Sequence, residues 1–158
     1  MTIAAEFEAA GLDDFAFEPD GETPWPTLGE MIEADNRLVV MFESGGGVDG
    51  APWVLGAFEH ASDTAFTFPS VDDFNCDLNR GPADAPLLLV NHWLSGFSSL
   101  VSDTRLVNAR EVLAPRLEEC LEVRGQIPNI VAVNFADIGD VHEVVDELNG
   151  VSAARGNR

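Results

Sequence analysis

Lysine and tyrosine are absent from the 158-residue sequence, and all eight of its basic residues are arginines. The 28 acidic residues outnumber them and give the chain a formal net charge of −20. A surface this acidic repels nucleic-acid phosphates and anionic membranes, which excludes nucleic acid as a partner beyond a local patch. The charge is typical both of a salt-adapted protein and of a merely soluble acidic protein from a GC-rich genome.

Long apolar runs and cysteines are also few. No run of about 18 apolar residues is present, so we expect no transmembrane segment. Residues 1–11 are amphipathic and acidic and lack the basic start and apolar centre of a secretory signal. The two cysteines, Cys76 and Cys120, are too few for a disulfide scaffold and fit no zinc motif. They are either two buried free thiols or one disulfide, and a disulfide would imply export.

What is present indicates a globular α/β protein. Hydrophobic residues make up 46% of the chain and charged residues 23%, which suits one domain with an apolar core. Ile130–Val133 is an apolar, β-branched run that predicts a strand buried on both faces. The polar residues Asn134 and Asp137 follow it, and Val141–Leu148 then has helical spacing. In such strand–helix units, chemistry lies at the carboxyl end of the strand.

Strands and helices alternate along the remaining chain. Further strands are predicted at Leu12–Phe17 (an edge strand), Arg37–Phe42, Thr64–Phe68 and Pro86–Val90. Further helices are predicted at Ile3–Ala10, after Thr27, at Pro52–Ala61 and at Leu106–Val123, where Pro115 is expected to break or kink the helix. The order favours a mostly parallel sheet in one domain, residues 1–150, with a frayed tail at residues 151–158.

A capping box marks the start of one of these helices. Thr27 is followed three residues later by Glu30, so each side chain can bond the other's backbone N–H. Leu28, Met31 and Ile32 then form the stripe that we expect to be buried.

Polar side chains follow two of the predicted strands. Glu43 follows Arg37–Phe42 and either lines a pocket or is a loop carboxylate that caps a helix. Asn91 and His92 follow Pro86–Val90 and either line the same pocket or, for His92, form a buried, hydrogen-bonded histidine.

The long loop at Pro69–Asp84 contains a single cation, Arg80. Asn79 and Arg80 are candidates for binding a substrate phosphate, because a guanidinium matches phosphate geometry. The alternative is that Arg80 ties down this acidic loop through Asp77 or Asp84.

Several separated blocks carry a family likeness: Trp25–Ile32, the strand ending at Glu43, Cys76–Gly81, Val90–Leu94, Cys120 and Pro128–Leu148. In this order they resemble bacterial proteins of the phosphatidylinositol-specific phospholipase C-like phosphodiesterase superfamily. The resemblance implies a TIM-type barrel, of which the chain matches only the C-terminal half. A full barrel takes about 250 residues, so we expect a partial barrel of about four mostly parallel strands with covering helices.

The resemblance also implies a reaction. The family cleaves a phosphodiester by internal attack of the inositol 2-hydroxyl, with two histidines as base and acid. We expect no cofactor and no metal ligand among these residues, and the sequence leaves metal dependence open. Those histidines belong to the N-terminal half, and His60, His92 and His142 do not correspond to them. The chain alone is therefore expected to be inactive on a phospholipid or other phosphodiester.

One catalytic position of the family falls within this chain. A carboxylate at the end of the last strand orients a catalytic histidine in the family, and Asn134 stands at the matching position. An amide holds a histidine tautomer by hydrogen bonding but does not stabilise the imidazolium by charge. Asp137, three residues on, is the alternative.

Three hypotheses follow. The first is the C-terminal portion of a phosphodiesterase that needs an N-terminal half-barrel, on the same gene or another chain. The second is a non-catalytic acidic binding or self-associating module, because open sheet edges favour pairing, including in a homo-oligomer. The third is an independent flavodoxin-type domain, which ranks last because no Gly-rich nucleotide loop follows its first strand. Members of the family are often exported, but these residues leave the compartment open.

Overall fold

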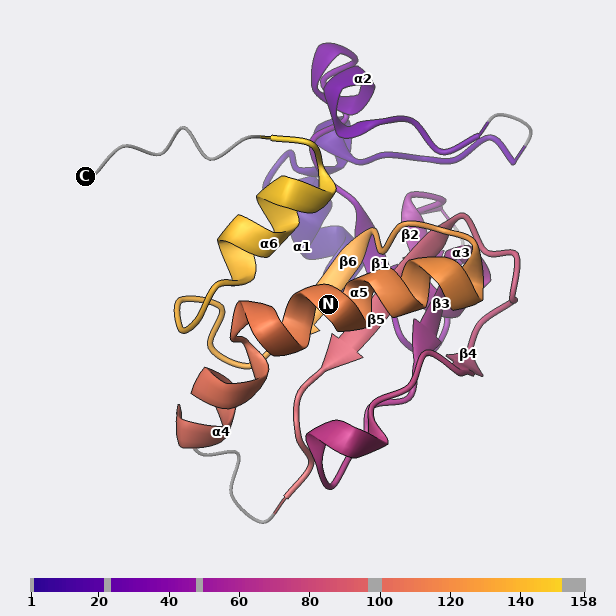
Figure 1. Ribbon diagram of the computed structural model, residues 1–158. Helices are drawn as coiled ribbons and strands as arrows, with labels where there is room; N and C mark the ends of the chain where they lie inside the picture. Colours follow the sequence, from indigo (N-terminus) through magenta and orange to yellow (C-terminus); the bar gives the residue numbers. More distant parts are fainter. Residues whose placement is uncertain (1, 22–23, 48–49, 97–100, 152–158) are drawn as a thin grey trace. The chain divides into compact units, whose positions relative to one another are not determined.

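The computed structural model describes residues 2–21, 24–47, 50–96 and 101–151 (Figure 1). Its helices and strands are, in chain order, α1 (Ile3–Ala9), η1 (Asp13–Phe15), α2 (Leu28–Glu33), β1 (Val40–Phe42), β2 (Val54–Gly56), α3 (Ala57–His60), β3 (Ala61–Thr64), η2 (Val71–Asp73), β4 (Leu78–Arg80), β5 (Leu87–His92), α4 (Val101–Val107), α5 (Arg110–Arg124), β6 (Ile130–Val133) and α6 (Val141–Leu148). The α/β class expected from the sequence is confirmed. The expectation for the tail falls, beyond Val151, outside the described residues.

The chain divides into two compact units. One is formed by residues 1–61 with 84–86, and the other by residues 62–83 with 87–158. In the first, β1 and β2 pair in parallel, with Val40 opposite Val54. Its core contains Val40, Val54 and Trp53, and the ring of Phe7 on α1 lies 5.6 Å from that of Trp53. The amphipathic helix predicted at the N-terminus is therefore confirmed, and it packs through Phe7.

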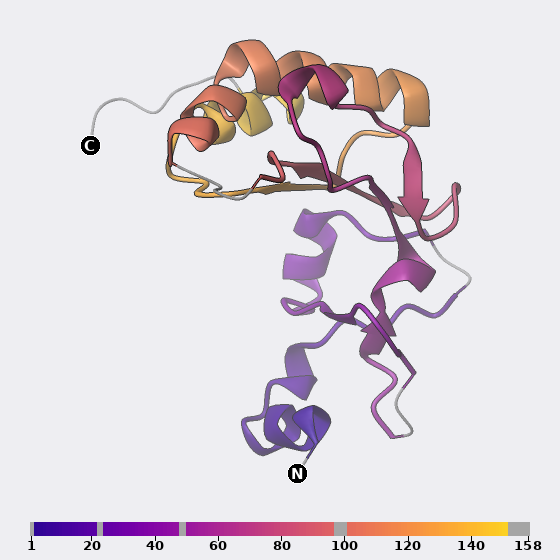
Figure 2. The ribbon, with the colours of Figure 1, turned by 90° about the horizontal axis from the view of Figure 1, so that it is seen from below.

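The second unit contains a four-stranded sheet in the order β4-β3-β5-β6. The strands β5 and β6 are parallel, with Leu89 opposite Ile130, whereas β3 and β4 are antiparallel. Helices α5 and α6 lie on the same face of β5 and β6 (Figure 2). The core between them consists of Cys76, Leu88, Val90, Leu113, Leu117, Cys120, Val141 and Val144.

The described strands form no closed barrel. They form one two-stranded and one four-stranded sheet, so the part of the chain that the structure describes has six strands where about four were expected. The antiparallel pair of β3 and β4 interrupts the expected parallel order. A partial TIM-type barrel therefore stays a prediction.

Several local signals are confirmed. The strand β6 and helix α6 lie where the periodicity placed them. The capping box forms: Glu30 N–H donates to Thr27 Oγ1 at 3.3 Å, and Thr27 N–H donates to Glu30 Oε2 at 2.8 Å. Gly125 ends α5 in the left-handed conformation with φ of 66°, which glycine adopts without strain.

Other boundaries were wrong. Leu12–Phe17 contains the short helix η1 and one bridge, Ala16 to Leu38, instead of an edge strand. Pro52–Ala61 is the strand β2 followed by α3, because Val54 pairs with β1. The third strand starts at Ala61 and ends at Thr64, and the long loop after it contains η2 and β4. Pairing with distant segments decided each of these cases over local propensity.

Pro115 does not break the long helix. It lies inside the continuous α5, and the break comes earlier, at Ala109, whose backbone is extended with ψ of 142°. A proline inside a helix removes one backbone hydrogen bond. Leu113 and Leu117, both fully buried, hold the helix against the sheet on either side of Pro115 in sequence.

Two burial expectations were also wrong. On α2, Met31 is buried, but Leu28 is 78% and Ile32 is 53% exposed. The strand β6 is not buried on both faces: Ile130 is 40% exposed and the following three residues are half-buried. An apolar pattern indicates which side chains favour burial. Which of them are buried depends on the elements that pack against them.

Cys76 and Cys120 form a disulfide, so the disulfide alternative is confirmed. Both residues are buried in the core of the second unit. The bond joins the segment before β4 to the middle of α5 across a sequence separation of 44 residues. The segment between the two cysteines, which contains β4 and β5, is therefore covalently closed into a loop.

Replacing both cysteines by alanine should lower the free energy of unfolding by about 2–4 kcal/mol, because the unfolded chain regains the entropy of the open loop. Urea unfolding of the oxidised chain and the variant measures the difference. The reduced wild-type chain is the matched control and should resemble the variant. Equal midpoints for the oxidised and reduced chains would contradict this role of the disulfide.

Candidate functional site

The carboxylate of Asp63 is the centre of a buried polar cluster in the second unit. Asp63 lies on β3 opposite Arg80 on β4 and has no exposed surface. Its Oδ2 accepts from Arg80 Nε at 3.0 Å and Nη2 at 2.5 Å. Its Oδ1 accepts from the Arg80 backbone N–H at 2.8 Å and from Asn79 Nδ2 at 3.1 Å. The pair is thus a forked, charge-assisted ion pair with further hydrogen bonds.

Asn91 connects this cluster to β5. Its Nδ2 donates to Asp63 Oδ2 at 3.2 Å and to the Thr64 carbonyl at 2.7 Å. Its backbone N–H donates to Thr64 Oγ1 at 3.0 Å. The predicted site residues Asn79, Arg80 and Asn91 are therefore brought together, and Asp63 is the residue that joins them.

Arg80 ties down its loop, but through a partner that the sequence analysis did not single out. The expected partners were Asp77 and Asp84, whereas the ion pair that the structure records joins Arg80 to Asp63. The guanidinium also lies over the ring of Phe66, with Cζ 5.0 Å from the centroid. The sequence did contain a signal for Asp63: it is the one charged residue in a four-residue strand whose other residues are small and uncharged.

His92 is a buried, hydrogen-bonded histidine in this structure. Its Nε2 lies 2.8 Å from the Val107 carbonyl, and its ring lies 4.8 Å from that of Phe74. Burial lowers the pKa of the imidazole to about 4; the hydrogen bond to Val107 opposes this, and the charge of Arg116 adds to it. The ring is therefore neutral at pH 7, with the Nε2 proton donated to Val107.

The loop after β6, which contains Asn134 and Asp137, is held by Asn108. The Nδ2 of Asn108 donates to the carbonyls of Asn134 and Ile138, both at 3.0 Å. The Asn108 carbonyl accepts from the Asp140 N–H at 2.9 Å. Asn108 is fully buried, so the backbone at Asn134 is fixed, while the side chain of Asp137 is exposed.

Gly139 permits this close approach. Its φ is +88°, and a Cβ at this position would lie 2.7 Å from both the Cβ and the carbonyl oxygen of Asn108. Only glycine therefore fits between the loop and Asn108. Asn108 was missed because nothing in the sequence links it to a loop 26 residues later.

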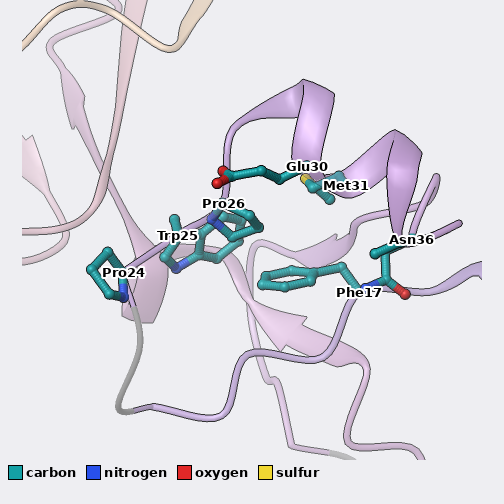
Figure 3. A pocket seen from close by; sticks show the side chains of 8 residues that line it. Phe17, Pro24, Trp25, Pro26, Glu30, Met31 and Asn36 are labelled. Carbon is teal, nitrogen blue, oxygen red and sulfur yellow. The ribbon is translucent and has the colours of Figure 1, made fainter.

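The first unit contains the remaining predicted site residue and a separate cavity. Glu43 directly follows β1 and is exposed. The cavity, of about 520 Å³, is shown in Figure 3. It is lined by Phe17, Pro24, Trp25, Pro26, Glu30, Met31, Ala34 and Asn36. None of these is a predicted site residue; Trp25 is partly exposed there and lies edge-on to Phe17, with ring centroids 5.1 Å apart.

The described residues contain no group of three or more histidine, cysteine or acidic side chains placed to hold a metal ion. Among the helices in the described ranges, none is long and apolar enough to cross a membrane.

The pKa of His92 makes stability depend on pH. The folded value of about 4 lies below the ordinary 6.5, so its contribution is complete above pH 6.5 and is lost as pH falls towards 4. Between pH 7 and 4.5 the loss should be about 2–3 kcal/mol. Urea unfolding at both pH values measures it. His92→Gln should lack this part of the acid sensitivity, whereas the exposed-site control His142→Gln should keep it; equal acid sensitivity in all three chains would contradict the assignment.

Comparison with known proteins places the chain in a family. The family model PI-PLC X matches residues 1–149. A "PI-PLC X domain-containing protein 1" of Arthroderma benhamiae is 27% identical over 89% of this chain and 51% of its own length. An "Uncharacterized secreted protein" of the same fungus is 28% identical over 95% of this chain and 40% of its own length. A PI-PLC X domain-containing protein of Arabidopsis thaliana is 26% identical over 94% of this chain and 37% of its own length.

No solved structure matches the chain. The chain spans about half, or less, of the length of these curated relatives. The family match nevertheless covers almost the whole sequence, including the cluster around Asp63 and the loop held by Asn108. The chain belongs to the PI-PLC X family.

Proposed function

We propose that this chain is the C-terminal portion of a phospholipase C-like phosphodiesterase and is inactive without the other half of the barrel. The family match over residues 1–149 carries the proposal. The chain spans between 37% and 51% of the length of each relative, which supports the proposal that it corresponds to about half of a longer protein. In this proposal, β3, β5 and β6 of the second unit are later strands of a TIM-type barrel and contribute their carboxyl ends to the site. The strand β1, in the first unit, is proposed separately as a strand of the same fold.

The substrate class is a phospholipid phosphodiester of the phosphoinositide type. Internal attack by a neighbouring hydroxyl on phosphorus requires a base to take its proton and an acid to protonate the leaving group. His92 is unsuited to either role, because it is neutral, enclosed and bonded to Val107. His60 lies against Trp25, with ring centroids 5.7 Å apart. None of the three histidines of this chain, His142 included, corresponds to the family's catalytic pair. We therefore propose that the acid and the base come from the other half.

The role of this chain is to orient one of those histidines and to form part of the substrate pocket. Asn134 is the proposed orienting residue, on a backbone that Asn108 holds in place. Asp137 is the alternative, and its exposed carboxylate lies in the same loop. In the second unit, Asn79, Arg80, Asn91 and His92 are proposed to line or support the substrate pocket. Glu43, in the first unit, is proposed separately as a substrate-binding residue. Because the charge of Arg80 is balanced by Asp63, Arg80 would contribute hydrogen bonds to a phosphate more than net positive charge.

The purified chain and its Asn134→Asp variant should show no turnover of phosphatidylinositol in mixed micelles, because the acid and base are absent. Adding the separately expressed remainder of a PI-PLC X relative should produce activity. In that reconstituted enzyme Asn134→Asp should raise kcat, by about tenfold or more, because a carboxylate stabilises the imidazolium.

Asp137→Asn is the matched control in the reconstituted enzyme: it should leave kcat unchanged if Asn134 is the orienting residue and lower it if Asp137 is. Measurable turnover by the chain alone would overturn the proposed division of roles. If the two halves form a complex but that complex does not turn over phosphatidylinositol, the catalytic proposal itself is wrong.

The disulfide also supports a proposal for the compartment. A buried bond between Cys76 and Cys120 forms and persists in an oxidising environment. One of the relatives is described as a secreted protein. We infer that this chain works outside the reducing cytoplasm.

A second candidate function is supported by the edge of the sheet. Within the described part of the chain, β6 pairs with β5 alone, although its four residues are all apolar. Ile130 is 40% exposed, and an apolar strand at a sheet edge is a template for another strand. The occupant is either a strand of the missing half or the same edge of a second copy, which would make the chain a self-associating module.

Sedimentation of the chain at micromolar concentration tests this edge. We expect an oligomer that Ile130→Lys converts to monomer, because lysine at a strand edge opposes pairing. Val123→Lys is the matched control, since Val123 is 59% exposed but lies on α5, and it should leave association unchanged. A wild-type chain that is monomeric and well folded would exclude self-association and leave the missing half as the occupant.

A further inference from the structure

Arg116 lies on α5 with its side chain enclosed in the second unit. The residue is only 3% exposed. Its guanidinium carbon is 5.0 Å from the ring centroid of Phe68 and 4.5 Å from that of Phe74. Its Nη2 makes a long hydrogen bond, 3.4 Å, to the Asn91 carbonyl. Two aromatic rings and one carbonyl thus surround a group that usually seeks water or an acid.

The remaining polar atoms of this guanidinium have no partner. Nε and Nη1 are both buried without a hydrogen bond. Other arginines of the chain are paired with carboxylates: Arg80 with Asp63, and Arg110 with Glu147. No such ion pair is recorded for Arg116 among the described residues, and the acid that acts on its charge, Glu119, is itself exposed.

The charge nevertheless persists at neutral pH. Burial lowers the pKa of Arg116 to about 10, and the nearby charge of Glu119 opposes that shift. At pH 7 the group remains a cation. A buried cation without a counter-charge is strongly unfavourable, and the two Phe rings offset only part of that cost. Among the described residues, no acidic side chain is recorded as bonded to this cation.

A second side chain that contacts Phe74, His92, also has a buried polar atom without a partner. His92 is fully buried, and its ring contacts Phe74 at 4.8 Å between centroids. Because its Nε2 proton is donated to Val107, its Nδ1 is an acceptor, and this Nδ1 has no partner. The two unpaired donors of Arg116 and the unpaired acceptor of His92 therefore belong to side chains that both contact Phe74. Such groups in native proteins are normally explained by a bound water or ion.

We propose that a compact inorganic anion, of the size of chloride, binds at the Nε and Nη1 edge of Arg116. The guanidinium supplies two N–H donors and a full positive charge, and no acidic side chain of the described residues competes for them. A water molecule that donates one hydrogen to His92 Nδ1 and the other to the anion satisfies the remaining acceptor. Because both side chains are buried, we expect the site to exclude bulky anions. The site shares His92 with the proposed substrate pocket, but it uses neither Asn134 nor Asp137, and its test measures a melting temperature and needs no catalysis.

Thermal unfolding in sodium chloride and in sodium gluconate, at equal sodium concentration, tests the site. Gluconate is too large for an enclosed site, so only chloride should stabilise the wild-type chain. The melting temperature should rise with chloride and then saturate, by about 3–5 °C at tenfold excess over the dissociation constant. Arg116→Met keeps the length of the side chain, removes its charge and should abolish the difference between the two salts.

Arg110→Met is the matched control. Arg110 is exposed and paired with Glu147, so this variant should keep the full chloride response. A chloride effect of the same size in Arg116→Met would overturn the proposal, as would equal melting temperatures in the two salts for the wild-type chain. If Arg116→Met fails to fold, crystals of the wild-type chain grown in sodium bromide decide: an anomalous bromide peak beside Arg116 supports the site, and water density alone there rejects it.

Discussion

The buried carboxylate of Asp63 is the constraint on which the sheet of the second unit depends. It has no exposed surface, and its donors come from β4 on one side and from β5 on the other, through Arg80, Asn79 and Asn91. A carboxylate without water is tolerated only when charge and hydrogen bonds replace its hydration. One side chain therefore fixes both neighbours of β3, while apolar packing supplies most of the stability.

The helices of this unit connect its core to its loops. Leu113 and Leu117 on α5 pack on the sheet together with the disulfide. Asn108, at the break before the same helix, holds the loop after β6, and the Arg110 N–H donates to Asp140 in that loop at 2.9 Å. The position of Asn134 is thus set by a helix that is itself anchored in the core. The orienting role that we propose for Asn134 requires this kind of rigid support.

Features set by neighbouring residues were predictable from the sequence, and features set by distant contacts were not. Thr27 and Glu30 are three residues apart, so their capping box is visible in the sequence, as is the strand–helix unit at the C-terminus. The exposure of Leu28 depends on what packs against α2, and no local pattern contains that information. The same holds for Arg80, whose partner Asp63 lies 17 residues away, beyond a loop with nearer acids.

The distribution of charge limits what this chain would contribute to the proposed phosphodiesterase. A phosphodiester is anionic and the chain carries a net charge of −20, so binding requires local positive charge. Near the strand ends, Arg80 is compensated by Asp63, and Arg116 is enclosed between two aromatic rings. Arg80 thus has its counter-charge, and Arg116, which is only 3% exposed, is not accessible to a substrate. We therefore infer that the positive charge for the phosphate comes, like the acid and the base, from the other half, and that this chain supplies orientation and the shape of the pocket.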